Sequence, residues 1–313
     1  MICPKACTGT NVRKKTVGDE RMTTALATRD LSAGFGAEVI GLAPRIPLDD
    51  DQVEQLRRLF DDKGMIVLRG VNVDLRFQTY LSHLLIGEEP LAEGSTILDR
   101  PTAKNERFVS NKEPDSGAPF GRLLYHSDLM WSEDVFRLLS LYGVEVEQPT
   151  SPTMFVSAAR AWETLPEDLR RRVEGRYAIH CQDATHRQRG DGDVLVSTFA
   201  EVESIRLPIG HRHPRTGRML LYVAQQMTDR IDGMDEAESE ALLQDLFDHM
   251  YRPENTVEHH WREGDLVLWD NIALQHARSN VRVEGPVRTL RKVLAPTPKP
   301  TWNAVRQFSK VGE

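Results

Sequence analysis

Three stretches of the chain repeat apolar residues at the spacing of one helix face. They are residues 49–64, 164–175 and 235–253. In the first stretch Leu56 and Phe60 stand four residues apart before Gly64, and a glycine commonly ends a helix. In the second stretch Thr164 and Glu167 have the spacing of a capping box. The pattern therefore predicts three amphipathic helices.

Outside these helices the apolar residues lie in short runs that are typical of β-strands. The runs are residues 65–70, 136–146, 153–158, 218–224, 256–261, 265–270 and 289–295. Many short strands with few helices favour a β-sandwich or barrel with helices packed outside it. A parallel βαβ alternation is not visible, and the sequence contains no glycine-rich phosphate loop of the GxGxxG or GxxxxGK[ST] type. The pattern thus gives little support to nucleotide-cofactor chemistry.

Length and composition narrow the class of protein. The 313 residues suit two ordinary domains or one large barrel. We expect a disordered tail over residues 1–22, a single domain over 23–300 and a C-terminal extension over 301–313. No run of about 18 apolar residues occurs, so no membrane segment is expected, and three cysteines without a framework suit a reducing, cytoplasmic setting. A net charge of -7 without a basic stripe predicts no nucleic-acid partner.

The segment GRLLYHSDLMW carries a pattern found among metal ligands. His126 and Asp128 stand two residues apart, and on an extended strand such positions point to the same side. Imidazole and carboxylate then converge on one point, as two ligands of a facial triad do. The alternative is a surface turn in which the aspartate caps the histidine. A third ligand has to come from elsewhere in the chain.

Seven other histidines are candidates for that third ligand. They are His180, His211, His213, His249, His259, His260 and His276. His249 falls in a predicted amphipathic helix, where we expect it to be solvated. His259 and His260 alternate on a strand, so at most one of them faces inward. His276 follows a buried strand through a turn, which is where a ligand at the mouth of a barrel is expected.

Arg288 is a charged residue on a strand that otherwise has the pattern of a protein core. A guanidinium in such a place needs an anionic partner. That partner is either a protein carboxylate or a bound anion, and the residues alone leave both open.

Taken together, three segments resemble the taurine dioxygenase-like (TauD/TfdA) family of Fe(II)- and 2-oxoglutarate-dependent dioxygenases. They are HSD at 126–128, GDLVLWDNIALQHAR at 264–278 and RTLRKV at 288–293. The similarity covers about residues 27–298, with the motifs in the family's order. The resemblance implies a mainly β fold with flanking helices, a cupin-like double-stranded β-helix or jelly roll.

The resemblance also implies roles for individual residues. His126, Asp128 and His276 would bind Fe(II) on one face and leave three positions open. The cosubstrate 2-oxoglutarate would take two of these positions and dioxygen the third. Arg288 and Thr153 would bind the distal carboxylate of 2-oxoglutarate, for which a planar guanidinium is the apt partner. Fe(II), one carboxylate and Arg288 sum to a charge of about +2, which a dianionic cosubstrate neutralises.

A small, anionic substrate is expected from the same resemblance. The family's second C-terminal arginine falls here on the pair Arg291-Lys292, and Lys292 shares one strand face with Arg288. An ammonium does not reproduce a bidentate fork, which speaks against a sulfonate clamp of the taurine type. The further candidate substrate contacts are Arg122, Tyr125 and Asn111. For the first of these, a surface ion pair is the alternative.

The function implied is oxidation, by default hydroxylation, of a C–H bond while 2-oxoglutarate and dioxygen become succinate and carbon dioxide. Two alternatives stay open: an iron oxygenase with the same triad that does not use 2-oxoglutarate, and a non-catalytic jelly roll that binds a ligand. The presence of Arg288 and Thr153 counts against the first, and the intact triad counts against the second. A homo-oligomer, either a dimer or a tetramer, is expected from the family.

Overall fold

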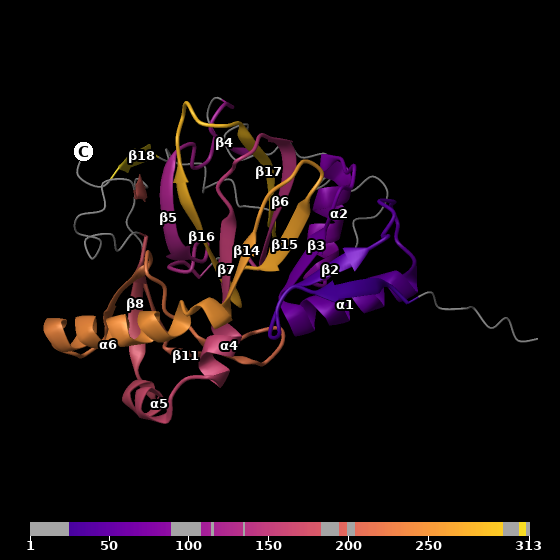
Figure 1. The fold of residues 1–313 in the computed structure, drawn as a ribbon. Coiled ribbons are helices and arrows are strands. Elements are labelled where there is room, and N and C mark those ends of the chain that lie inside the picture. The colour runs from indigo at the N-terminus through magenta and orange to yellow at the C-terminus, as the bar shows by residue number, and fades with distance from the viewer. Residues whose placement is uncertain are drawn as a thin grey trace, which may run out of the picture.

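The computed structural model describes residues 25–88, 108–113, 116–133, 135–182, 194–198, 204–296 and 307–310. The predicted tail over 1–22, with Cys3 and Cys7, and the predicted extension apart from 307–310 lie outside these residues. Within the described residues, two β-sheets face each other and helices pack against their outer sides (Figure 1).

The two sheets are built from strands of both halves of the chain. The larger has the order β1-β2-β3-β15-β6-β17-β4, with bounds β1 Ala27–Asp30, β2 Ala37–Ile40, β3 Met65–Leu68, β15 Leu266–Asp270, β6 Leu138–Val146, β17 Arg288–Ala295 and β4 Phe108–Ser110. The smaller has the order β14-β7-β16-β5, with bounds β14 Thr256–His259, β7 Thr153–Ser157, β16 Leu274–Val281 and β5 Gly121–His126. Two facing, mainly antiparallel sheets make the jelly roll that was predicted.

Large apolar side chains fill the space between the sheets. Phe155 of β7 packs edge-on against Trp269 of β15, with ring centroids 5.2 Å apart. Along β15, Val267 and Trp269 belong to this inner core, whereas Leu266 and Leu268 belong to the core on the other side of the sheet. Alternate residues of one strand thus serve two layers, which explains why the run LVLWD is apolar throughout.

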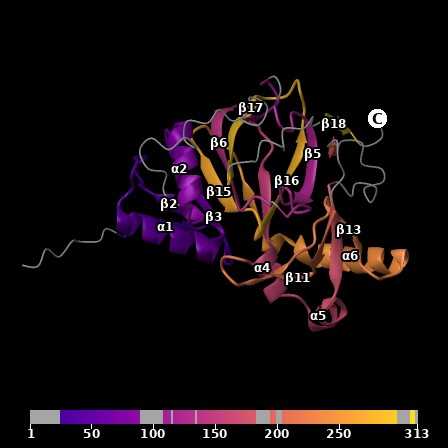
Figure 2. The same ribbon diagram turned by 180° about the vertical axis from the view of Figure 1, so that it is seen from behind.

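Two helices cover the outer face of the larger sheet (Figure 2). They are α1 (Asp50–Lys63) and α2 (Leu75–Leu85). The bounds of α1 confirm the first predicted helix, and Gly64 ends it in the left-handed conformation. Nine of the eleven residues of α2 are buried. Its buried residues include the polar Gln78, Ser82 and His83, and the sequence analysis did not predict this helix.

A third group of elements lies below the sandwich in the view of Figure 1 and shares a separate apolar core. It contains the strands β8 Tyr177–Cys181, β10 Ser204–Pro208, β11 Gly210–Arg212, β12 Met219–Leu221 and β13 Thr228–Ile231, and the helices α4 Ala158–Glu163, α5 Glu167–Val173 and α6 Glu236–Met250. The short helix η3 (Pro253–Asn255) follows α6, and β9 (Leu195–Thr198) pairs with β18 (Gln307–Lys310). The bounds of α6 confirm another predicted helix.

Two details of the pattern were wrong. The predicted capping box at the start of α5 does not form, because the Thr164 hydroxyl donates to the carbonyl oxygen of Arg160 at the end of α4. Pro166 stands at the N-cap of α5 instead, without a side-chain hydrogen bond. One parallel unit also exists, since β2 and β3 pair in parallel on either side of α1. Its strands are only four residues long, too short for an alternation to be seen.

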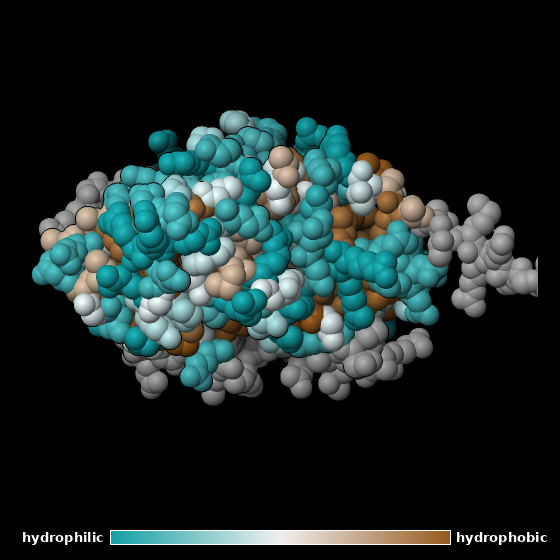
Figure 3. Space-filling view, turned by 90° about the horizontal axis from the view of Figure 1, so that it is seen from below, coloured by the Kyte–Doolittle hydropathy of each residue, from teal (hydrophilic) through white to brown (hydrophobic). Residues whose placement is uncertain are grey.

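None of the described helices is long and apolar enough to cross a membrane. The face of the molecule seen in Figure 3 is largely hydrophilic, and apolar residues show there only in patches between polar ones.

Candidate metal centre

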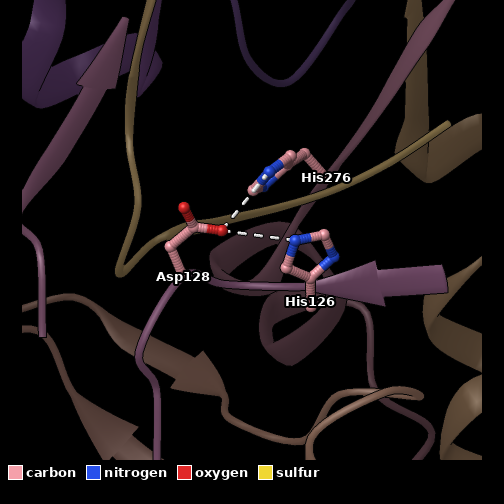
Figure 4. Close-up of side chains that lie close together, drawn as sticks. All are labelled: His126, Asp128 and His276. Atoms are coloured by element: carbon pink, nitrogen blue, oxygen red, sulfur yellow. Dashed lines mark ion pairs between the residues drawn. The ribbon is translucent and has the colours of Figure 1, made fainter. Parts of the chain in front are cut away.

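His126 and His276 lie opposite each other on neighbouring strands. The antiparallel pairing of β5 with β16 brings the two residues into register, and their ring centroids are 4.3 Å apart. Asp128 follows His126 by two residues, just beyond the end of β5, and turns its carboxylate toward both rings (Figure 4). The structure therefore brings the three predicted ligands together from positions up to 150 residues apart in the chain, as the numbers 126 and 276 show.

The three side chains converge on one carboxylate oxygen. Oδ1 of Asp128 is 3.3 Å from Nε2 of His126 and 3.7 Å from Nε2 of His276. One donor atom of each side chain lies within 4.8 Å of the others. Two imidazole nitrogens and one carboxylate on the same side are the donor set of a facial triad. Among the described residues, no other group of three or more histidine, cysteine or acidic side chains has this spacing.

The protonation of the centre suits metal binding, which needs deprotonated ligands. Nδ1 of His126 lies 2.7 Å from the carbonyl oxygen of Leu124, so an Nδ1–H donates there and Nε2 keeps its lone pair. Burial, together with the charge of His126, lowers the pKa of His276 to about 3. Burial alone would raise the pKa of Asp128, but the neighbouring His126, Lys292 and His276 hold it well below its usual value. At neutral pH the centre therefore contains the Asp128 carboxylate and a neutral His276 imidazole.

The two rings are held in different ways. Nδ1 of His276 is buried without a hydrogen-bond partner, and the ring is packed instead against Trp269, with centroids 5.0 Å apart, and against Phe155 at 6.5 Å. The backbone of Asp128 is clamped by the side-chain amide of Asn271, whose Oδ1 accepts from the Asp128 N–H at 2.9 Å and whose Nδ2 donates to its carbonyl oxygen at 2.8 Å. Sequence analysis missed Asn271, although it lies in the segment WDN that was part of the resemblance.

Arg288 and Thr153 also lie together. The guanidinium of Arg288 donates to Oγ1 of Thr153 at 3.2 Å and to the carbonyl oxygen of Ser151 at 3.2 Å. Nε1 of Trp261 donates to the same Thr153 oxygen at 2.9 Å. Arg288 is only 3 % exposed, and burial lowers its pKa to about 10. No carboxylate in the part of the chain that the structure describes is paired with it, so the protein-carboxylate alternative finds no partner there.

A second buried arginine lies beside this pair. Arg278 donates to backbone carbonyl oxygens of residues 118–121 and is 3 % exposed. Burial and the neighbouring charge of Arg288 both lower its pKa well below the usual value. A guanidinium nevertheless remains protonated in proteins, and the carbonyl oxygens around Arg278 favour that form. Sequence analysis quoted this residue within QHAR without giving it a role.

The candidate substrate contacts divide into two groups. Lys292 is 8 % exposed and its charge acts on both Asp128 and His276, which places it beside the centre. Arg291 points the other way, donating to Oε1 of Gln78 at 2.8 Å on the side of α2. The expectation that Lys292 and not Arg291 faces the site agrees with these contacts.

The other three candidates lie at different places. Arg122 is half-buried on β5, where its backbone forms an isolated bridge with Val194. Tyr125 is stacked on Tyr251, with centroids 4.3 Å apart, on the face of the sheet away from the two ligand histidines, and burial raises its pKa to about 12. Asn111 is buried and uses its amide on backbone groups.

The contacts of Asn111 fix the loop before β17. Its Nδ2 donates to the carbonyl oxygens of Arg282 and Pro286, both at 3.0 Å, and its Oδ1 accepts from the backbone N–H of Arg288 at 2.9 Å. The side chain thus holds Arg288 in place and is not turned toward a substrate in this structure.

The remaining histidines serve other purposes. The expectation that His249 is solvated was wrong: it is buried, and its Nε2 lies 2.8 Å from the carbonyl oxygen of Ala161 in α4, because α4 packs on that side of α6. His259 is buried while the His260 side chain is 72 % exposed, which confirms that only one of them faces inward. His180, His211 and His213 lie outside the group of three ligands.

Known proteins match the chain over most of its length. Residues 27–294 match the family model described as "Taurine catabolism dioxygenase TauD, TfdA family". Pentalenolactone F synthase of Streptomyces avermitilis is 29% identical over 293 residues, which covers 85% of this chain and 92% of that protein. The alpha-ketoglutarate-dependent 2,4-dichlorophenoxyacetate dioxygenase of Cupriavidus pinatubonensis is 26% identical, covering 77% of this chain and 88% of its own length.

A solved structure agrees with the fold. The crystal structure of a taurine dioxygenase from Burkholderia xenovorans superposes with a TM-score of 0.68 at 25% identity, and the match covers 87% of this chain and 90% of the other. The family model extends from the first strand of the larger sheet into β17. The chain therefore belongs to the taurine catabolism dioxygenase TauD, TfdA family and is a 2-oxoglutarate-dependent dioxygenase.

Proposed function

We propose that His126, Asp128 and His276 bind Fe(II), and that this centre oxidises a C–H bond of a small anionic molecule. The observation that carries the proposal is the convergence of two imidazole Nε2 atoms on one carboxylate oxygen, at 3.3 and 3.7 Å. No arginine among the described residues pairs with that carboxylate, and the oxygen that faces both imidazoles is suitably placed to bind a metal with them. Two neutral nitrogens and one carboxylate on one face suit non-haem Fe(II), which supplies the redox chemistry with dioxygen when it is bound.

Arg288 and Thr153 are the residues that we assign to the distal carboxylate of 2-oxoglutarate. A buried guanidinium without a counter-ion is unfavourable, and a bound dianion replaces the missing charge. The Thr153 oxygen already accepts from Trp261 and Arg288, so its single hydrogen is left to donate to a carboxylate. The indole of Trp261 and the ring of Phe155 are buried next to this pair. They exclude water, which strengthens the attraction between guanidinium and carboxylate.

Lys292 is the residue that we assign to the anionic group of the substrate. It is buried on the same strand as Arg288, and its charge reaches the carboxylate of Asp128. Two relatives are named after an anionic substrate, which is 2,4-dichlorophenoxyacetate for one and a sulfate ester for the other. An ammonium holds such a group as a point charge and without a fixed plane, so we expect carboxylates and sulfate esters to be accepted alike. Hydroxylation is the default outcome.

Two further statements of the sequence analysis stay predictions. A homodimer or homotetramer is expected, and light scattering after size-exclusion chromatography measures it. A cytoplasmic location is expected as well, and fractionation of the source cells tests it.

Anaerobic titration tests the iron and the cosubstrate together. Adding Fe(II) and then 2-oxoglutarate to the metal-free protein is expected to give the visible charge-transfer band of the iron chelate. Arg288→Ala should require much more 2-oxoglutarate for the same band. Arg291→Ala is the matched control, because that guanidinium points toward α2. Absence of the band in the wild type would refute the function, and identical titrations for Arg288→Ala and wild type would refute the anchor.

Succinate release measures the substrate range. A panel of carboxylates, sulfate esters, sulfonates and amino acids, each compared with turnover in its absence, is expected to single out anionic compounds. Lys292→Met should raise KM for the best of them and leave the 2-oxoglutarate titration close to that of the wild type. An uncharged compound preferred by both proteins would overturn the assignment of Lys292.

A further inference from the structure

Arg278 holds a short segment of the chain that leads into the ligand strand β5. Its Nε donates to the carbonyl oxygen of Gly121 at 3.3 Å, and its Nη1 donates to that of Ala118 at 2.8 Å. Its Nη2 donates to the carbonyl oxygens of Phe120 and Gly121 at 2.5 and 3.1 Å. One buried side chain thus gathers three carbonyl groups of residues 118–121, and His126 follows on the same strand.

The backbone of this segment has an unusual shape. Ala118 has a φ of 53° and Gly121 a φ of 77°. Glycine adopts such values freely, but an alanine rarely does. The segment therefore needs contacts that keep it in this conformation, and the guanidinium of Arg278 supplies them from inside the barrel.

Arg278 lies next to the anion site assigned above. In the pairing of β16 with β7 it is opposite Thr153, the residue whose hydroxyl receives the guanidinium of Arg288. The charge of Arg288 acts unfavourably on that of Arg278, and in the described part of the chain neither is paired with a carboxylate. Two buried cations side by side repel each other in a medium of low dielectric constant. A dianion bound at Arg288 attracts both of them.

We propose that Arg278 is a positioning residue that couples the binding of 2-oxoglutarate at Arg288 to the closed conformation of residues 118–121. This rests on the proposed cosubstrate site. When the anion is bound, the repulsion between the guanidiniums is offset and Arg278 stays on its carbonyl oxygens. Without the anion, the segment opens more often, and the start of β5 loosens with it. His126 lies at the other end of this strand.

Thermodynamic reciprocity makes the proposal quantitative. If 2-oxoglutarate favours the closed segment by some factor, closing the segment favours 2-oxoglutarate by the same factor. Couplings of this kind commonly amount to about 5- to 150-fold. Arg278→Lys keeps a positive charge near the anion but replaces the planar fork, whose three nitrogens each donate to the segment, with a single ammonium nitrogen. This variant therefore distinguishes the effect of the hydrogen bonds to residues 118–121 from the effect of the positive charge alone.

Amide hydrogen exchange over residues 116–126 measures the clamp directly. The protein is loaded with Mn(II) in place of iron, with and without 2-oxoglutarate, so that no turnover occurs. In the wild type, 2-oxoglutarate is expected to slow exchange in this segment by about 5-fold or more. In Arg278→Lys the segment should exchange faster even without 2-oxoglutarate, and the protection that 2-oxoglutarate confers should be lost. Arg291→Lys, on β17 of the larger sheet and facing α2, is the control and should behave as the wild type does.

Different failures have different meanings. If 2-oxoglutarate gives no chelate band with Fe(II) in the wild type, the proposed cosubstrate site is wrong. If the band forms but exchange over 116–126 is the same with and without 2-oxoglutarate, the coupling is wrong while the site stands. If Arg278→Lys keeps the full protection, the guanidinium is not the link. Unchanged exchange in α6 shows that the variant is folded.

Discussion

Two aspartates, the half-buried Asp128 and the buried Asp270, both face histidine nitrogens, but only Asp270 is also paired with an arginine. Oxygens of Asp270 lie 3.1 Å from Nε2 of His213, and the same carboxylate forms an ion pair with Arg215. Asp128 meets two imidazoles, and no arginine of the described residues pairs with it. One carboxylate is paired with an arginine, whereas the other faces two imidazoles and the more distant charge of Lys292. A histidine beside an aspartate is therefore not by itself evidence of a metal site.

The histidines of the two clusters differ in the same way. Nδ1 of His213 accepts from the backbone N–H groups of Arg215 and Thr216, both at 3.1 Å, so its Nε2 carries the hydrogen that it donates to Asp270. Nδ1 of His276 has no hydrogen-bond partner, and its Nε2 is turned toward the ligand carboxylate. The ring nitrogens of His213 are thus both used inside the protein, whereas the Nε2 of His276 faces the second imidazole and the carboxylate of the proposed metal centre.

A third cluster follows the structural pattern. Oδ2 of Asp265 lies 3.2 Å from Nε2 of His259 and accepts from Nη1 of Arg69 at 2.9 Å. The arginine again comes from a distant part of the sequence, and the carboxylate is again almost fully buried. The presence of an arginine thus separates these two carboxylates from Asp128, the one that we assign to the metal.

The largest expected effect on activity comes from removing the Asp128 carboxylate, which has no arginine partner among the described residues. Asp128→Ala deletes one metal ligand and should reduce succinate release to the background without enzyme. The metal-free variant should unfold at nearly the denaturant concentration of the wild type, because the burial of that carboxylate is itself unfavourable. Steady-state turnover and urea unfolding of the metal-free proteins check both parts. A variant that turns over normally would contradict the assignment of the centre.

The paired carboxylate should show the opposite behaviour. Asp270→Ala leaves Arg215 and His213 without their partner, and breaking a buried ion pair of this kind costs about 3–5 kcal/mol of stability. It also removes the acceptor for the N–H groups of Ile272 and Ala273, both at 3.0 Å, in the turn before β16. Urea unfolding of the metal-free protein measures the loss. If Asp128→Ala is the more destabilising of the two, the distinction between the clusters does not hold.

Asn271 joins the two regions and should have an intermediate effect. It follows Asp270 in the chain, and its amide clamps the backbone of Asp128. Mutating a residue that orients a metal ligand without binding the metal itself typically weakens metal affinity by about 10- to 100-fold. Asn271→Ala should therefore weaken metal binding by that factor. Asn255→Ala is the control, because this buried amide donates to His249, away from the centre. Competition with a chelator measures both affinities, and equal losses would contradict the role of Asn271.

Much of the metal centre could be predicted because its signals are local or ordered along the chain. His126 and Asp128 were paired by their spacing of two residues, although Asp128 lies just beyond the end of β5, and His276 and Arg288 were identified by the order of motifs. Family membership, the dioxygenase class and the jelly roll are confirmed by the comparisons. The assignment of individual residues to iron and 2-oxoglutarate remains a prediction.

The positions that escaped prediction depend on partners far away in the sequence. His249 was expected in solvent, but its acceptor is a carbonyl oxygen of α4, 88 residues earlier. Asn111 was expected in the pocket, yet its amide is used on the loop before β17. Tyr125 was expected beside the substrate and is stacked on Tyr251 of the third group of elements. No local pattern reports such contacts, because tertiary packing creates them.

His180 shows what a buried histidine does when no carboxylate accompanies it. Its Nδ1 lies 3.1 Å from Oγ1 of Thr228 and its Nε2 has no partner. Burial, with a smaller effect of the His211 charge, lowers its pKa to about 3, as burial does for His276. The unfolded chain takes up a proton near its ordinary pKa of about 6.5, but the folded chain does not. Stability from each histidine is therefore complete above that pH and is lost as the pH falls toward 3.

The smallest effect that we predict is a change in this slope. Each of the two histidines should lower the free energy of unfolding of the metal-free protein by about 1.4 kcal/mol per pH unit below 6.5. His180→Gln removes one contribution, so its slope between pH 6 and about 5 should be smaller by that amount. The other contribution, from His276, should persist. Urea unfolding at several pH values measures the slope, with His260→Gln at an exposed position just after β14 as the control. An unchanged slope in His180→Gln would mean that this histidine is already protonated in the folded protein, and burial without a carboxylate would then not keep a histidine neutral here.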